Sequence, residues 1–198
     1  RMHPVTLGDD VVTLSVPTVE DVDAITAICQ DPEIQEWTTV PSPYRREHAV
    51  GFVEDLVRSG WEDDRERNWA VRVDGRLVGM VGLGRRPLRC AEVGFWMAPD
   101  ARGRGLLDRA LRLVLDHAFD PGGMDLERVE WKAFAGNWRS WRAVWRHGFR
   151  FEGALRRGGV HRDARRDDWV GGLLRDDPRE PVLPWPGTVV DPLGTPPA

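Results

Sequence analysis

The sequence predicts a single domain of the mixed α/β class, and three local patterns support this prediction. Residues 69–73 and 77–83 are rich in β-forming side chains and flank an Asp-Gly pair, a strong signal for a β-hairpin. An apolar strand over residues 93–97 leads through a glycine-containing segment into an amphipathic helix over residues 106–119. Residues 128–135 alternate in side-chain type and form the next expected strand. A strand, a helix and a strand in this order indicate that the two strands are parallel.

The first part of the chain is expected to contain one strand and two helices. Alternating side chains over residues 11–16 predict the strand, and a Thr followed three positions later by Asp starts a helix over residues 18–29. Three prolines interrupt residues 31–44, which are therefore expected to form an irregular loop. Apolar residues at helical spacing predict a second helix over residues 45–59.

The last part of the chain is expected to add one helix, two strands and a tail. The helix spans residues 138–147 and stops at Gly148, a residue type common at helix C-termini. Strands follow over residues 149–157 and 168–174. We therefore expect one domain over residues 1–176. Residues 177–198 are rich in proline and are expected to form a tail on the surface or on a partner.

Composition narrows the class of protein. The 198 residues are enough for one domain with a full core. The net charge of −4, from 28 basic and 32 acidic residues, argues against a nucleic-acid partner. No run approaches the roughly 18 apolar residues of a membrane span, and the first residues carry no secretory pattern, so we expect a cytoplasmic protein without a membrane partner. Cys29 and Cys90 are expected to be packed, reduced thiols.

The segment over residues 97–107 has the chemistry of a phosphate site. Glycines at 103 and 105 allow a pyrophosphate to lie against bare backbone at a helix start, where N-H groups have no intrahelical partner. Arg102 and Arg104 add positive charge. The segment is neither a P-loop nor a dinucleotide fingerprint, because it lacks Gly-Lys-Ser/Thr and has aspartate at 108 in place of a third glycine.

These residues resemble a known family. Arg102-x-x-Gly105-x-Leu107 is similar to the Gln/Arg-x-x-Gly-x-Gly/Ala signature of the GNAT acyl-CoA N-acyltransferases, although Leu107 replaces the usual Gly or Ala. Residues 91–99 resemble the family's splayed fourth strand. Asn137 and Ser140, followed by Gly148-Phe149, resemble a second family signature. The resemblance covers roughly residues 10–175 and is nearest to the branch that acetylates ribosomal-protein N-termini, with related succinyltransferases.

The resemblance implies a fold and a set of coenzyme contacts. It implies a central, mostly antiparallel seven-stranded sheet with a parallel, splayed pair of fourth and fifth strands, flanked by about four helices. It also implies acetyl-CoA, or succinyl-CoA, as a co-substrate. The residues that it assigns to coenzyme binding are Phe95, Trp96, Met97, Arg102, Gly103, Arg104, Gly105, Leu106, Leu107, Asn137 and Ser140.

Two side chains are candidates for proton transfer. From its position alone Ser140 is more often a helix cap or a solvated side chain. The resemblance instead makes Ser140 the donor to departing coenzyme A, with the Phe95 N-H polarising the carbonyl. Glu92 is the candidate base, and a surface carboxylate is the alternative interpretation. An α-amine, with a pKa of about 7.7 to 8, needs a base less than a lysine near 10.4 does.

The acceptor is expected to be a primary amine, on a protein N-terminus or a small molecule, that attacks the acyl group directly in a ternary complex. Trp37 and Tyr44 are assigned to the substrate cleft. The six basic residues within 156–166 are expected either to attract a carboxylate or to form a solvated turn. A non-catalytic acyl-CoA-binding module is the rival hypothesis. The five histidines show no metal-ligand spacing, so no metal is expected, and the apolar tail suits a homodimer.

Overall fold

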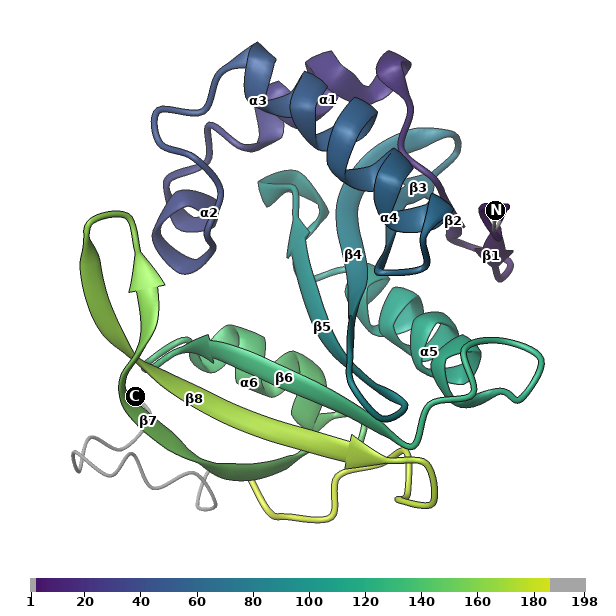
Figure 1. The fold of residues 1–198 in the computed structure, drawn as a ribbon, viewed down its shortest axis with the longest axis vertical. Coiled ribbons are helices and arrows are strands. Elements are labelled where there is room, and N and C mark those ends of the chain that lie inside the picture. Colours follow the sequence, from purple (N-terminus) through teal and green to yellow (C-terminus); the bar gives the residue numbers. More distant parts are fainter. Residues whose placement is uncertain (1–2, 186–198) are drawn as a thin grey trace.

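One eight-stranded sheet runs through the computed structural model, which describes residues 3–185 of the chain (Figure 1). The strands are β1 (Leu7–Gly8), β2 (Thr13–Ser15), β3 (Glu66–Val73), β4 (Arg76–Arg86), β5 (Cys90–Met97), β6 (Arg128–Phe134), β7 (Arg150–His161) and β8 (Ala164–Leu174). Their order across the sheet is β1-β2-β3-β4-β5-β6-β8-β7. Only the β5–β6 pair is parallel, which confirms the mixed, mostly antiparallel fold. The two-residue β1 adds one edge strand to the seven that were expected.

The helices agree with the sequence prediction except in one segment. They are α1 (Val22–Ile28), α2 (Pro32–Trp37), α3 (Arg46–Gly51), α4 (Arg58–Glu62), α5 (Leu106–Phe119) and α6 (Trp138–Trp145). Short 3-10 turns at Val19–Asp21 and Pro99–Ala101 precede α1 and α5. A π-helical stretch, Phe52–Val57, joins α3 to α4, so the expected second helix is one rod of three parts.

The prediction of an irregular loop over residues 31–44 was wrong for the first half of this segment. This part forms α2, because Asp31 caps the helix by accepting a hydrogen bond from the Ile34 N-H at 3.2 Å. Pro32 occupies the first helical position, where the missing N-H costs nothing and the fixed φ favours the helix. Pro32 therefore begins this helix, whereas a proline in the interior of a helix would interrupt it.

The two faces of the sheet are covered differently. A large core of buried side chains lies between one face and helices α5 and α6, and it includes Trp69, Val93 and Trp131. A smaller core joins α1, α2 and α3 to the opposite face at Ala70 and Met80. That smaller core covers β3 and β4, and Trp96 near the end of β5 packs against it. On β6 the buried Trp131 alternates with the exposed Lys132, so polar side chains occupy the uncovered part of this face.

The parallel strands β5 and β6 separate after four residue pairs. Cys90–Val93 pairs with Arg128–Trp131, and β5 then continues to Met97 without β6. Just beyond the last residue pair of β4 and β5, the Ala98 N-H donates a hydrogen bond of 2.8 Å to the Val78 carbonyl. Because alternate residues direct their backbone groups to opposite neighbours, those of Phe95 and Met97 face the side that β6 has left. This is the splayed strand pair that the sequence predicted.

The described part of the tail packs on its own chain. The Trp145 indole donates to the Leu183 carbonyl at 2.8 Å, and the Trp185 ring lies 5.3 Å from that of Trp145 and 5.9 Å from that of Trp138. Trp185 is therefore covered by α6. Residues 186–198 of the expected tail lie outside the described residues, and the domain boundary at residue 176 stays a prediction. Within residues 3–185, no helix combines the length and apolarity needed to cross a bilayer.

Candidate active site

A cavity of about 1300 Å³ opens where β5 and β6 separate, with α2 on one side and α6 on the other. This volume suits a ligand larger than a typical drug. Most of the residues assigned from the sequence line it. They are Trp37, Glu92, Phe95, Trp96, Met97, Arg102, Gly103, Gly105, Leu106, Leu107, Asn137 and Ser140. Arg104 and Tyr44 lie outside this lining.

The turn before α5 has the backbone conformation of an anion site. Gly103 and Gly105 have φ angles of +71° and +72°, in the left-handed region that glycine tolerates. A Cβ at either position would meet open space, so a ligand can approach the bare backbone there. The turn leads into the 14-residue helix α5, whose first N-H groups have no intrahelical acceptor. The geometry therefore fits a pyrophosphate.

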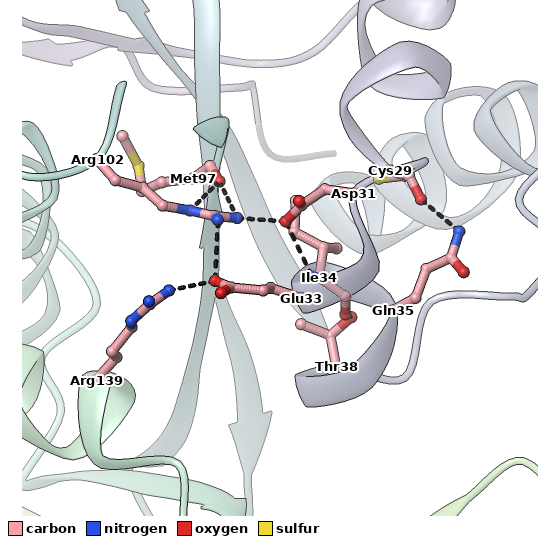
Figure 2. A network of polar contacts seen from close by, with 9 residues as sticks. All are labelled: Cys29, Asp31, Glu33, Ile34, Gln35, Thr38, Met97, Arg102 and Arg139. Carbon is pink, nitrogen blue, oxygen red and sulfur yellow. Dashed lines mark hydrogen bonds and ion pairs between the residues drawn. The ribbon is translucent and has the colours of Figure 1, made fainter. Parts of the chain in front are cut away.

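The Arg102 side chain binds α2 across the cavity mouth (Figure 2). Its Nη2 is 2.5 Å from Asp31 Oδ2, and its Nη1 is 3.1 Å from Glu33 Oε2. Its Nε also donates to the Met97 carbonyl at 3.2 Å. Arg139 of α6 reaches the same Glu33 carboxylate. The Arg102 guanidinium, which the sequence analysis expected at a phosphate, thus ties the glycine turn to α2.

Ser140 is held with its hydroxyl proton available. The Trp131 indole, which can only donate, lies 2.9 Å from Ser140 Oγ. The Ser140 oxygen is therefore the acceptor of that bond, and its O-H can point into the cavity. The Ser140 N-H donates to Asn137 Oδ1 at 3.2 Å, so Asn137 is the helix N-cap. Ser140 is not the capping side chain that the alternative interpretation allowed.

Two carboxylates share the polar floor of the cavity. Glu92 Oε2 lies 2.8 Å from Arg86 Nη2 and 3.7 Å from Lys132 Nζ. Asp168 of β8 also lines the cavity. Burial raises the pKa of Asp168, the nearby Glu92 raises it further, and Lys132 opposes them. Sequence analysis missed Asp168 as a site residue, although its place beside the buried Trp169 puts it on the opposite face of the strand.

One side of the cavity is closed by the β7–β8 hairpin. Arg166 lies 5.1 Å from the Trp37 ring centroid and donates to Glu36 at 2.8 Å. The Gln35 carbonyl accepts a hydrogen bond from Arg162 Nη2 at 3.0 Å, and it lies 2.9 Å from His161 Nε2. Figure 1 shows the hairpin tip beside α2. These three residues of the basic segment are therefore neither a fully solvated turn nor free cations.

Tyr44 does not border the cavity as the sequence prediction placed it. Its side chain is buried in the smaller core, together with Cys29, and burial raises the pKa of its hydroxyl. Tyr44 therefore packs into the smaller core and not toward the cavity. Sequence analysis also missed the arginine stripe formed by Arg139 and Arg142 of α6 and by Arg146 directly after it, which lines the cavity. Within the part of the chain that the structure describes, no group of three His, Cys, Asp or Glu side chains could hold a metal.

A splayed parallel strand pair, a glycine turn at a helix start and a cavity between them define a class of acyltransferase folds that bind a phosphate-bearing co-substrate along an open strand. Residues 12–150 match the family described as an acetyltransferase (GNAT) domain. Since this match spans more than half of the sequence, the chain belongs to the GNAT acetyltransferase family.

Individual relatives agree with this assignment. The chain is 36% identical over 96 residues to YdaF of Bacillus subtilis, provisionally named a ribosomal N-acetyltransferase, covering 46% of this chain and 51% of that protein. It is 30% identical over 93 residues to the ribosomal-protein-serine acetyltransferase of Escherichia coli, with the same coverage of each. The chain spans about half the length of these curated relatives. RimJ of Mycobacterium smegmatis, solved with CoA-disulfide, superposes with a TM-score of 0.78 at 25% identity, covering 87% of this chain and 90% of that one.

Proposed function

We propose that this protein is an N-acetyltransferase that moves an acetyl group from acetyl-CoA to a primary amine by direct attack in a ternary complex. The observation that carries the proposal is the open edge of β5, which leads from the polar floor of the cavity to the glycine turn. A thioester co-substrate would supply the activated acetyl group. An open strand edge provides backbone groups that can hydrogen-bond its pantetheine arm.

The residues present fit such a co-substrate. Backbone groups of Phe95 and Met97 would hold the arm, and the Phe95 N-H would polarise the carbonyl. The Trp96 backbone faces β4, so this residue would contribute only its side chain, which lines the cavity. The turn over residues 102–107 would hold the pyrophosphate through its backbone, with Arg104 as an exposed charge nearby. The arginine stripe of α6 adds positive charge on the same cavity wall. Asn137, whose oxygen is used as a cap, keeps its amide N-H groups for the coenzyme.

Ser140 would give its hydroxyl proton to the departing thiolate. The bond from Trp131 fixes the Ser140 oxygen and leaves the proton free, as a general acid requires. Glu92 is a candidate for the base because it lines the same cavity, although its Oε2 already faces two cations. The non-catalytic alternative predicts that acetyl-CoA binds but no acetyl group is transferred.

A protein N-terminus is the acceptor we favour. The Bacillus subtilis and Escherichia coli relatives carry ribosomal acetyltransferase names. Acetyl-CoA is favoured over succinyl-CoA because Arg162 and Arg166, the cations that could receive an extra carboxylate, already donate to α2. The homodimer and the cytoplasmic location stay predictions. A light-scattering mass of one chain would contradict the homodimer.

Thermal melting with acetyl-CoA, succinyl-CoA and free coenzyme A tests the proposal first. A ligand at 100 times its dissociation constant adds about 2.7 kcal/mol of stability. We expect acetyl-CoA to raise the melting temperature most. Transfer is then measured by mass spectrometry on a peptide with an N-terminal serine, with the N-acetylated peptide as a blank. No shift with any of the three ligands would contradict the assigned cavity.

Two glycine variants provide a matched control. Gly103 and Gly75 both have positive φ, +71° and +77°, and a Cβ at either would meet open space. Gly103→Ala and Gly75→Ala should therefore lose similar stability, about 1 to 2 kcal/mol. Only Gly103 lines the cavity, so only Gly103→Ala should reduce the shift caused by acetyl-CoA. Equal shifts in both variants would mean that the turn does not contact the coenzyme.

A further inference from the structure

Asp168 occupies the floor of the cavity at the end nearest to the β7–β8 hairpin. The next residue, Trp169, is fully buried on the opposite face of β8 and packs 4.6 Å from the Trp138 ring of α6. Because side chains alternate along a strand, Asp168 is directed away from that core and into the cavity. Lys132 of β6 and Glu92 of β5 line the same floor. The sheet thus brings two carboxylates and one ammonium group to a single surface.

The packing around Asp168 leaves space for its carboxylate. Gly159 lies on the neighbouring strand β7, and a Cβ there would collide with Asp168 Oδ1. The same Cβ would lie 2.8 Å from Cε1 of the Phe134 ring. A glycine at 159 is therefore what lets the Asp168 carboxylate sit between β7 and the Phe134 ring.

The two floor carboxylates differ in what they already bind. Glu92 Oε2 faces Arg86 at 2.8 Å and Lys132 at 3.7 Å. The Asp168 carboxylate makes no hydrogen bond or ion pair with any residue among 3–185. A carboxylate that is half-buried and has no partner in a cavity has its lone pairs available for a ligand proton. Asp168 is therefore the better placed of the two to receive one.

The charges around Asp168 are few and can be named. Lys132 on β6 favours its ionised form, whereas Glu92 on β5 and Asp167 on its own strand oppose it. Burial acts in the same sense and is the largest cause of the raised pKa of Asp168. The Arg166 guanidinium lies 4.7 Å from the Phe134 ring centroid, and it forms an ion pair with the Glu36 carboxylate. The β7 neighbours, Leu155 and Gly159, carry no charge.

We propose that Asp168 accepts the proton of the attacking amine, in place of Glu92. This inference rests on the proposed acetyl transfer. The amine nitrogen forms a bond to the acetyl carbon, and the carbon–sulfur bond breaks. The proton that nitrogen loses goes to Asp168, and the thiolate takes its proton from Ser140. Asp168 then releases its proton to solvent and the Ser140 oxygen takes one from solvent, which restores both groups. A carboxylate with raised pKa suits this role because general bases work best when their pKa lies nearer to the working pH.

The test compares five variants of the full chain, one of them Glu92→Gln, with acetyl-CoA and a peptide carrying an N-terminal serine. Asp168→Asn should lower kcat by about 10²-fold, a typical contribution of a general base. Asp168→Glu, which keeps a carboxylate, should recover part of that loss. Gly159→Ala should lower kcat by pushing the carboxylate aside. Asp163→Asn, an exposed carboxylate at the tip of the same hairpin, is the matched control and should leave kcat unchanged.

The pH profile separates a proton acceptor from a structural residue. In the wild type, kcat should fall at low pH as Asp168 becomes protonated. In Asp168→Asn that limb should vanish, and only the titration of the acceptor amine should remain. The melting temperature and the shift caused by acetyl-CoA should stay near the wild-type values in Asp168→Asn, which shows that the fold and the coenzyme site are intact.

The outcomes are distinct. A wild-type kcat and an unchanged low-pH limb in Asp168→Asn would overturn the role of Asp168 and leave the acetyltransferase proposal standing. Loss of the low-pH limb in Glu92→Gln, with the limb kept in Asp168→Asn, would return the role to Glu92. If the wild type transfers no acetyl group to the peptide or to ethanolamine, the proposed function fails, and the inference about Asp168 falls with it.

Discussion

One face of the sheet is closed by α5 and α6, while α1, α2 and α3 close the other face over β3, β4 and the Trp96 end of β5. The closed face holds the large aromatic core, including the fully buried Trp69, Trp131 and Trp169. The open part of the other face carries Glu92, Lys132 and Asp168 at the floor of the cavity. One face of these strands thus stabilises the fold, and the other face carries polar side chains of the cavity. Substitutions on the closed face should change stability, and substitutions on the open face should change turnover.

The largest effect is expected from a tryptophan of the closed face. Trp69 is fully buried, its ring lies 5.2 Å from that of Trp61, and its indole donates to the Val5 carbonyl at 2.7 Å. Trp69→Ala should lower the free energy of unfolding by about 3 to 5 kcal/mol, because it removes apolar contacts and leaves a cavity. Urea denaturation measures this loss. Trp37→Ala, at the half-buried cavity mouth, is the control and should cost much less; equal losses would contradict the division of the two faces.

Ser140→Ala, on the part of α6 that lines the cavity, should sharpen the comparison. We expect kcat to fall by about 10²-fold, since a general acid contributes on that order. The dissociation constant of acetyl-CoA should change little, because Asn137 still caps α6 through the backbone of residue 140. The free energy of unfolding should fall by about 1 to 3 kcal/mol, because the buried Trp131 indole loses its acceptor. Steady-state kinetics and calorimetric titration separate kcat from the dissociation constant. Turnover equal to that of the wild type would remove Ser140 from the mechanism.

The smallest effect concerns pH and a histidine under the closed face. His117 Nε2 lies 2.7 Å from Arg67 Nη1, so the neutral ring accepts that hydrogen bond. Burial lowers the pKa of His117, and Arg67 lowers it further, while Asp120 and Asp64 oppose them. The unfolded state therefore binds a proton more readily than the folded state, and stability falls as the pH drops below the ordinary histidine pKa of about 6.5.

Melting curves between pH 7 and pH 5 check this expectation. The wild type should lose more stability over this interval than His117→Gln, in which no imidazole titrates at this position. Some loss should remain in the variant, because burial also lowers the pKa of His147 on the C-terminal side of α6. The same pH dependence in both proteins would show that His117 does not contribute to it.

The sequence predicted those parts that depend on local pattern. Helix α5 begins and ends at the predicted residues, because its apolar stripe and the preceding glycine turn are both local signals. The strand splay and Ser140 followed from short motifs that resemble the family. Helix α2 was missed because a proline at a helix start was taken for a break. The bond from Arg102 to Asp31 joins residues 71 positions apart, and no local pattern reports such a contact.

Asp168 could not be selected from sequence for a related reason. Two adjacent aspartates open the predicted last strand, and one of them, Asp167, accepts the Arg157 N-H at 2.6 Å as a structural bond. Only the register of β6 with β8 and of β7 with β8 shows which of the two enters the cavity. Alternation along a strand shows that neighbouring side chains lie on opposite faces, but the pairing with neighbouring strands is needed to show which face borders the cavity.

The contact between α2 and the β7–β8 hairpin has a consequence for how the protein is made. His161 and Arg166 meet Gln35 and Glu36, so the two sides of this contact are 126 and 130 residues apart. During synthesis the helix leaves the ribosome long before its partner, and the growing chain must keep α2 without that support. Contacts of such long separation form late in folding. A nascent chain that ends before the hairpin therefore lacks one wall of the cavity, and it acquires this wall among the last steps of folding.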